Sequence, residues 1–464
     1  MNGMRRVITV LAVVTLVLYS GVAFAAGYNL AGVGAKALSM SGAFRGIADD
    51  WSAMYWNPAG LAGQNTMVYL EVKSLYPMVW VTPDVPNQVD RYEMYRNGEE
   101  VSTRDAAYPA GAFAALYKIN DKMTAGIGVY APTAIGTKWE NLTLGPPYGY
   151  NNTVAWPDED WSSDLKVIDI HPSIGYMLND KLKVGLGISI VYSTITLQSP
   201  LTVPTGAPIP FQNFYAIGEL DGSGIGYGVN IGALYSLTEQ LDVGISYKSA
   251  ITVGVEGNLN QTVYHPYSLG VYGQTNDARF LGGTEKASPD ASADFPLPQE
   301  AGIGFGYKPN DRLTIGLDVM WTNWASVEVV DIEADGDGLY GAPAEDSELV
   351  LEYEDVIRYN IGIDYALMPE KLNIRCGYYL DPTAIPDESL RPSITDVADK
   401  HSVSIGFAYM VSEKLVIEGY WEHLFTSERD NDVYYNADDG SLENLPGTWK
   451  MQVDTFGLQF GYRF

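Results

Sequence analysis

The chain has 464 residues, of which 46% are hydrophobic and 12% aromatic, and it carries 57 acidic against 28 basic residues for a net charge of −29. Phosphate backbones are bound by Lys and Arg, so a chain this acidic excludes nucleic acid as an expected partner. A single cysteine, Cys376, excludes an internal disulfide as the source of stability.

The first 25 residues have the pattern of a secretory signal peptide. Arg5 and Arg6 precede an apolar run that ends in the small-residue pattern Ala23-Phe24-Ala25, which is typical of a cleavage site. A retained membrane anchor is the alternative, and the cleavage pattern disfavours it. We therefore predict a signal peptide over residues 1–25.

Residues 26–65 lack the period of two that marks a strand, and they are rich in small and aromatic residues. Asp49 or Asp50 can cap a short helix through Met54, and Asn57-Pro58 places a capping side chain before a proline at the first position of another turn. A disordered tail is more polar and less aromatic than this segment. We interpret it as a compact plug, or hatch, rather than a periplasmic tail.

From residue 66 onward the chain alternates apolar and polar residues, and one motif is repeated: a strand that ends near Tyr, a tight polar turn, and a strand that begins with Leu or Met. Each copy of the motif predicts a hairpin with a short turn. The six copies begin at Tyr117, Tyr176, Tyr235, Tyr307, Tyr365 and Tyr409. The predicted strands are 66–77, 107–119, 123–132, 162–178, 181–198, 217–237, 240–258, 294–308, 312–331, 351–368, 371–381, 400–411, 414–427 and 449–464.

The opposite connections are long and rich in Pro, Gly and acid, as in 133–161, 199–216, 259–293 and 332–350. An even number of strands, with short turns on one side and long loops on the other, is typical of a bacterial outer-membrane barrel. A soluble β-sandwich is the alternative, but such a fold rarely has fourteen strands with short turns at one end and long loops at the other. We predict an all-β transmembrane fold, a 14-stranded antiparallel barrel over residues 66–464 plugged by the hatch.

Side-chain alternation in the last predicted strand supports a membrane location. Phe456, Leu458, Phe460, Tyr462 and Phe464 share one face, which gives an apolar band of roughly 27 Å at about 3.3 Å per residue. The Tyr residues at the short turns are expected to form the periplasmic aromatic girdle. Because the chain ends in Phe464, like the assembly signal of outer-membrane barrels, we expect the barrel assembly machinery as a partner.

The segment AGYNLAGVGAKALSMSGAFRGIADDWSAMYWNPAGL resembles the amino-terminal hatch of the FadL/TodX family, outer-membrane transporters of long-chain fatty acids and other hydrophobic compounds. Further similarity lies in LNDKLKVGLGISIVY, in GYGVNIGALY and in the stretch from Asp381 to Lys400. The resemblance covers essentially the whole mature chain. It implies passive uptake of a hydrophobic small molecule, which lands on an outer groove, enters a lumen pocket and leaves sideways where strand three is kinked.

The resemblance also assigns residues. Tyr28 matches the aromatic residue that the family's N-terminus inserts into the interior pocket, and Asn57, Pro58 and Ala59 match the hatch motif. The segment Tyr130–Gly136, with Ala131 and Pro132, matches the kinked part of strand three. Pro132 has no amide hydrogen for a neighbouring strand, so the residues independently indicate either a bulge or the end of the strand there.

The chain departs from the family at the site that holds a carboxylate. Fatty-acid transporters of the family place basic residues just beyond strands five and nine, where this chain has Ser199 and Asp331. Neither can pair with a carboxylate, and Asp331 would repel one. The ligand is therefore expected to be a neutral hydrocarbon, or a fatty acid held by other cations such as Arg358 or Arg375.

No cofactor and no metal site are predicted. The loop after Asp331 begins like a calcium loop, but its twelfth position is Ala342 instead of a bidentate Glu. A loose cation contact to lipopolysaccharide phosphates stays open, and a solvated loop is the simpler interpretation. The four His residues, at 171, 265, 401 and 423, show no metal spacing.

Two other functions are alternatives to transport. An outer-membrane lipid-modifying enzyme of the phospholipase type would need a nucleophile beside a His, and only His401 with Ser402 or Ser404 offers one. Sequence neighbours on a strand point to opposite faces, so we expect no enzyme. A general diffusion porin conflicts with a hatch. The expected protein is a monomeric outer-membrane transporter in contact with outer-membrane lipid and lipopolysaccharide.

Overall fold

The computed structural model describes residues 32–85, 95–143, 145, 157–205, 211–267, 278–393, 396–432 and 444–464. The predicted signal peptide and Tyr28 lie outside these ranges. Within them, none of the helices is long and apolar enough to cross a membrane.

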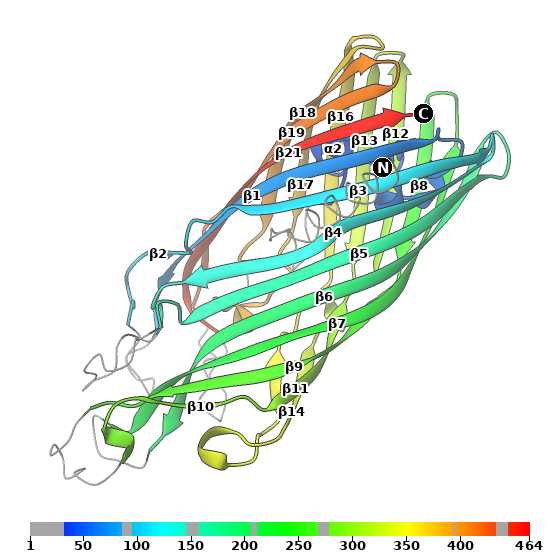
Figure 1. Ribbon diagram of the computed structural model, residues 1–464. Helices are drawn as coiled ribbons and strands as arrows, with labels where there is room; N and C mark the ends of the chain where they lie inside the picture. The colour runs from blue at the N-terminus through cyan, green and yellow to red at the C-terminus, as the bar shows by residue number, and fades with distance from the viewer. Residues whose placement is uncertain are drawn as a thin grey trace, which may run out of the picture.

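The strands form one antiparallel sheet that closes on itself as a barrel of 14 wall strands (Figure 1), as the sequence predicts. The first strand, β1 (Met67–Pro83), pairs with the last, β21 (Gly447–Arg463), from Met67 opposite Arg463 to Pro83 opposite Gly447. Closure pairs the backbone groups of both edges, which a sheet in lipid requires because no water is there to bond them.

Ten of the wall strands are continuous, and four consecutive ones are each made of two collinear pieces, β8 with β9, β11 with β12, β13 with β14 and β15 with β16. The strands between β1 and β21 have the following bounds: β2 (Val101–Ser102), β3 (Tyr108–Asn120), β4 (Met123–Trp139), β5 (Trp161–Met177), β6 (Leu182–Pro204), β7 (Asn213–Ser236), β8 (Leu241–Lys248), β9 (Ile251–Tyr264), β10 (Thr284–Ala287), β11 (Asp290–Leu297), β12 (Glu300–Asn310), β13 (Leu313–Thr322), β14 (Val329–Asp335), β15 (Ser347–Val350), β16 (Val356–Met368), β17 (Leu372–Asp381), β18 (Lys400–Ser412), β19 (Leu415–Thr426) and β20 (Arg429–Asn431). The helices are α2 (Ala35–Ser39), α3 (Ala53–Trp56), η1 (Pro58–Leu61), η2 (Ala278–Phe280), η3 (Trp324–Ser326), η4 (Leu339–Gly341) and η5 (Asp387–Ser389).

Side chains alternate between membrane and lumen along each wall strand, because successive residues of a strand point to opposite faces. In β21, Phe456, Leu458, Phe460 and Tyr462 are exposed on the outside, whereas Gln459 between them is completely buried. Five of the six turn Tyr residues are exposed in the same way: Tyr117, Tyr176, Tyr235, Tyr307 and Tyr409.

Several strands run further toward the long loops than predicted. The strand predicted to end at Pro132 continues to Trp139, and the predicted loop 199–216 begins with strand residues up to Pro204. Both predicted ends stand at or beside a proline, Pro132 in β4 and Pro200 in β6. Proline has no amide hydrogen for a ladder bond, which is why the sequence placed these strand ends too early.

Candidate functional site

Residues 32–64, which we call the inner segment, lie inside the barrel and contain α2, α3 and η1 (Figure 1). Glycines in the wall strands let the backbone of the inner segment contact the backbone of the wall. A Cβ added at Gly185 of β6 would lie 2.1 Å from the carbonyl carbon of Pro58, and one at Gly244 of β8 would lie 2.0 Å from the carbonyl oxygen of Arg45. Any larger residue at these two positions would push the inner segment away from the wall.

Asn57 ties the inner segment together and joins it to the wall. Its Oδ1 accepts a hydrogen bond from the amide of Ala59 at 3.2 Å, and Pro58 occupies the first position of η1. Its Nδ2 donates to the carbonyl oxygens of Arg45, at 3.0 Å, and of Ala233 on β7, at 3.1 Å. The side chain is completely buried, so these bonds are its only compensation for losing water among the described residues.

Two charged contacts fix the inner segment to different walls. Arg45 is buried against Asp318 of β13, with Nη1 3.3 Å and its backbone amide 2.9 Å from Oδ2. Lys36 contacts Asp49 at 2.8 Å and Asp364 of β16 at 3.6 Å, and Asp364 also accepts a bond from Arg375. Buried ion pairs add little net stability but enforce one geometry, so they hold the segment in register.

Asp50 introduces an unfavourable charge into this interface. Its Oδ1 accepts hydrogen bonds from the amide and hydroxyl of Ser52 at 2.8 and 2.6 Å. Burial, with the charges of Glu418 and Asp49 nearby, raises the pKa of Asp50 to about 7. At neutral pH the inner segment therefore contains a carboxyl group that is poised between its two charge states.

β4 bulges beside the inner segment, at the residues predicted as the kink. Its register with β5 shifts between Tyr130 and Thr133, so that Ala131 and Pro132 together face one residue of β5. Pairing with β3 ends at Tyr130, opposite Ala112, although β4 itself continues to Trp139 along β5. Within the described part of the chain, the stretch after Tyr130 has no ladder partner on the β3 side until Lys138 accepts a bond from the amide of Arg104.

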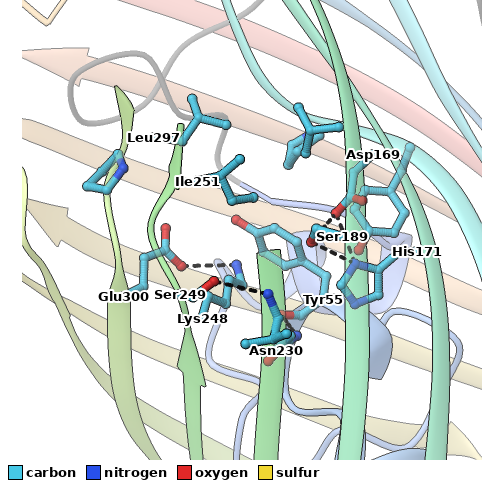
Figure 2. A pocket seen from close by; sticks show the side chains of 15 residues that line it. Tyr55, Asp169, His171, Ser189, Asn230, Lys248, Ser249, Ile251, Leu297 and Glu300 are labelled. Atoms are coloured by element: carbon cyan, nitrogen blue, oxygen red, sulfur yellow. Dashed lines mark hydrogen bonds and ion pairs between the residues drawn. The ribbon is translucent and has the colours of Figure 1, made fainter. Parts of the chain in front are cut away.

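A small cavity of about 60 Å³ lies between this bulge and the inner segment (Figure 2). Tyr130 and Pro132 line it from the bulge and Tyr55 from α3, with the Tyr55 and Tyr130 rings 6.0 Å apart and nearly perpendicular. The rest of the lining comes from β5, β6, β7, β8, β9, β11 and β12 and from the breaks between β8 and β9 and between β11 and β12: Asp169, His171, Ser189, Val191, Val229, Asn230, Lys248, Ser249, Ile251, Leu297, Pro298 and Glu300.

The lumen on the long-loop side of this cavity is apolar. Trp139, Trp161 and Trp449 pack there with Val and Leu side chains of the surrounding walls. The described residues between β17 and β18 contribute to the cluster: Ile385 and Leu390 are buried in it. Pro392 accepts hydrogen bonds through its carbonyl from Trp139 Nε1 at 2.8 Å and Thr137 Oγ1 at 3.0 Å. The loop between β17 and β18 thus places apolar side chains against the lumen cluster.

The sequence-predicted site residues separate into two groups. Asn57, Pro58 and Ala59 lie in the inner segment, and Ala131 and Pro132 form the bulge that borders the cavity. Ser199 lies far along β6 opposite Gly218, and Asp331 is an exposed residue of β14 opposite Glu348. Neither of those two lines the cavity. Tyr28 lies outside the described residues.

Lys248 and Arg358 are among the cations that face the lumen near the inner segment. Lys248 Nζ lies 3.0 Å from Glu300 Oε2 and 3.2 Å from the centre of the Tyr55 ring, so its charge is largely balanced. Arg358 of β16 is buried with its guanidinium 3.8 Å over the Tyr379 ring, and its Nε and Nη2 have no hydrogen-bond partner within the described chain. The sequence named Arg358 as a possible anchor, but Lys248 and His171 gave no signal because their inward direction depends on register.

The residues considered for an enzyme do not come together. His401 points outward, where its Nδ1 contacts the Tyr378 hydroxyl at 2.7 Å. Ser402 donates to Glu422 and Ser404 contacts Ser41, both inside the barrel. In the part of the chain that the structure describes, no group of three or more His, Cys, Asp or Glu could hold a metal ion.

Comparison with known families gives one match over almost the whole chain. The model of the family described as outer membrane protein transport protein (OMPP1/FadL/TodX) matches residues 16–464. The 47 kDa outer membrane protein of Pasteurella multocida is 24% identical, over 97% of this chain and 96% of its own length. The long-chain fatty acid transport protein of Escherichia coli O6:H1 is also 24% identical, over 97% of both chains.

Solved structures share the fold at lower identity. A FadL homologue from Pseudomonas aeruginosa superposes with a TM-score of 0.73 at 19% identity and covers 95% of this chain and 100% of its own. The toluene transporter TodX of P. putida gives a TM-score of 0.70 at 17% identity, over 94% of this chain and 99% of its own. These two similarities establish a common barrel architecture.

We expect Asn57→Asp to loosen the inner segment without disturbing the wall. The substitution keeps the acceptor for Ala59 but removes the donors to Arg45 and Ala233, and each buried carbonyl left unpaired costs about 1–3 kcal/mol. Hydrogen exchange in residues 44–61 should accelerate by at least tenfold. Asn179→Asp is the matched control, because Asn179 uses only its oxygen, as an acceptor from Lys181 and Leu182. Equal exchange in the two variants would contradict the role given to Asn57.

Packing of the inner segment should weaken as pH rises from about 4 to 7. An exposed Asp loses its proton near 3.8, whereas buried Asp50 keeps it to about pH 7. Between pH 4 and 7 the packed state therefore binds more protons than the loosened state, so its stability falls as the pH rises through this range. Above pH 7 Asp50 causes no further change in stability. Exchange of residues 50–56, corrected for intrinsic rates, should be faster at pH 8 than at pH 5. Asp50→Asn should abolish the difference, and a difference that persists in this variant would assign it to other groups.

Proposed function

The chain belongs to the outer membrane protein transport family (OMPP1/FadL/TodX), and from this premise we propose that it takes up hydrophobic molecules passively across the outer membrane. The ligands are long-chain fatty acids or neutral hydrocarbons. The long loops capture the ligand, the lumen binds it, the inner segment acts as a movable hatch, and the ligand leaves sideways at the β4 bulge. Relatives named for fatty acid and for toluene transport support this ligand class.

The observation that carries the proposal is the place where β4 loses its β3 partner. Beyond Tyr130 the wall has no ladder bonds on that side within the described chain until Lys138, so a hydrophobic molecule could pass there without breaking backbone pairs. The same bulge contacts the inner segment through Tyr55 and Tyr130. Movement of the inner segment would therefore change both the lumen and the side opening at one point.

Apolar burial is sufficient to bind such a ligand. Each methylene moved from water into the lumen contributes about 0.8 kcal/mol, so a long alkyl chain needs no charged anchor. The buried aromatic and aliphatic side chains around Trp139 and Trp449 offer that environment. Release requires the environment to change, and we assign that change to the inner segment together with Tyr28.

Closing the bulge should block uptake but not assembly. Deleting Ala131 and replacing Pro132 with Val makes β4 match β5 residue for residue and restores an amide donor toward β3. We expect uptake of labelled alkane or oleate by cells to fall at least tenfold, while heat-modifiable migration of the folded barrel is kept. Pro200→Val, in the extension of β6, is the control for losing a strand proline. Normal uptake after closure would refute exit at this bulge.

Arg358 separates the two ligand classes. It is the buried guanidinium in the described lumen with unpartnered nitrogens, so a carboxylate ligand would bind it. If fatty acids are the ligand, Arg358→Met should lower their affinity about tenfold or more while alkane affinity changes little. The measurement is titration of both ligands into the purified protein in nanodiscs. Equal effects on the two ligands would exclude Arg358 as a carboxylate anchor.

A further inference from the structure

Asp169, His171 and Ser189 form a buried polar group beside the β4 bulge. They project from β5 and β6 into the cavity described above (Figure 2). His171 Nδ1 lies 2.9 Å from Asp169 Oδ2 and 3.1 Å from Ser189 Oγ, and the Ser189 hydroxyl donates to Asp169 Oδ2 at 3.0 Å. The His171 side chain is only 2% exposed. Nothing in a purely hydrophobic route requires such a group.

The geometry excludes a nucleophilic role for Ser189. In a hydrolytic triad the serine contacts one ring nitrogen and the carboxylate the other, so that the histidine can take the serine proton. Here both Ser189 and Asp169 contact Nδ1, and the serine hydroxyl is already committed to the carboxylate. The group therefore fixes the imidazole instead of activating a nucleophile.

Fixing the imidazole leaves an acceptor for a ligand. A carboxylate at Nδ1 holds the proton on that nitrogen, so Nε2 of the neutral ring is an acceptor. His171 Nε2 has no hydrogen-bond partner among the described residues, nor do Asp169 Oδ1 and Asn230 Oδ1. Asp169 and Asn230 are 5% and 1% exposed. The Tyr130 hydroxyl, on the same lining, also has no partner among the described residues. Buried polar atoms are nearly always paired, so these unpaired atoms indicate an occupant whose polar group both donates and accepts, as a hydroxyl does.

Charge decides what kind of donor fits. The cavity is lined by two carboxylates, Asp169 and Glu300, and by one ammonium, Lys248, which Glu300 already pairs at 3.0 Å. An anionic ligand would meet excess negative charge there. A cationic ligand would be attracted by this net negative charge, but it would have to lose its water in the cavity, and removing a charge from water costs more than removing a hydroxyl. A neutral donor avoids that cost, and the titration of decylamine tests the choice.

Size and surroundings complete the assignment. A cavity of about 60 Å³ has room for a small polar group, since about 10–15 Å³ of volume on this measure holds one water. Val191, Val229, Ile251 and Leu297 supply apolar walls around it. The cavity therefore matches the hydroxyl end of a molecule that is otherwise hydrophobic.

We propose that the Asp169–His171–Ser189 cavity binds the hydroxyl group of hydrophobic alcohols or phenols on their way to the β4 bulge. This assignment rests on the proposed transport function and names a ligand class for it. The hydroxyl donates to one of the free acceptors, and the alkyl or aryl part extends into the apolar lumen. Hydroxylated molecules should thus be preferred over hydrocarbons of the same length and over the matching carboxylates.

The test compares ligands of one length on the full-length protein in nanodiscs. Decan-1-ol, decane, decanoate and decylamine are titrated, with empty nanodiscs correcting for partition into lipid. We expect decan-1-ol to bind about tenfold more tightly than decane, which corresponds to about 1.4 kcal/mol, and decanoate no better than decane. Equal affinity for alcohol and alkane, which is the result expected if only water fills the cavity, would overturn the proposal, as would tightest binding of decylamine.

Variants locate the effect. His171→Phe keeps a ring beside Tyr130, whose centre lies 5.8 Å away, but removes both nitrogens, and Asp169→Asn removes the charge that fixes the imidazole. The preference for alcohol over alkane should fall toward one in both variants. Asp221→Asn, an exposed carboxylate of β7, is the control and should keep the preference. An unchanged preference in His171→Phe would overturn the site.

The two hypotheses fail in different ways. If cells take up decane but the purified protein shows no alcohol preference, transport stands and the hydroxyl site is wrong. If neither decane nor decan-1-ol enters cells through the protein, transport of this ligand class is wrong. The ligand series on the unmodified protein keeps the proposal falsifiable even if a cavity variant does not assemble.

Discussion

The width of the lumen is the constraint on which the rest of the structure depends. Fourteen strands enclose more space than inward side chains of the wall can fill. The inner segment occupies that space, and every polar group it carries in must find a partner there. Asn57, Arg45 and Lys36 meet this requirement by bonding to wall residues, and wall glycines such as Gly185 allow contact at backbone distance.

The resulting interface contains buried charged groups as well as an apolar cluster. Charged pairs such as Arg45 with Asp318 specify one position for the inner segment but contribute little net stability, because each charge has been removed from water. The apolar cluster around Trp139 and Trp449 lies on the loop side and includes Ile385 and Leu390 from the connection between β17 and β18. In the proposed transport, a hydrophobic ligand would meet this apolar surface first and the polar interface second.

The β4 bulge connects these two environments to the membrane. One extra residue in β4 ends its pairing with β3, and the Tyr130 ring at that point packs against the inner segment. The polar cavity lies at the same junction, with Pro132 and Tyr55 on its lining. In the proposed transport, coupling between the inner segment, the cavity and the exit at the bulge would therefore need no long-range path.

Alternation and turn chemistry were enough to predict the barrel, its strand number and its six short turns. The continuation of two strands past Pro132 and Gln198 was missed because a proline stands at or just after each predicted end and lacks the amide hydrogen that a ladder bond needs. The assignment of Ser199 and Asp331 as ligand positions rested on alignment alone. An alignment does not show where along the barrel axis a residue lies, and both residues lie away from the cavity.

The sequence by itself determined which faces are apolar and where the chain turns tightly, and it predicted a segment over residues 26–65 that is no part of the wall, because these properties are local. Only the tertiary structure decided which polar residues meet. His171, Asn230 and Lys248 come from three strands, and their convergence on one cavity is set by register and shear. A one-residue change in register would turn each of them to the membrane, and no local pattern records that choice.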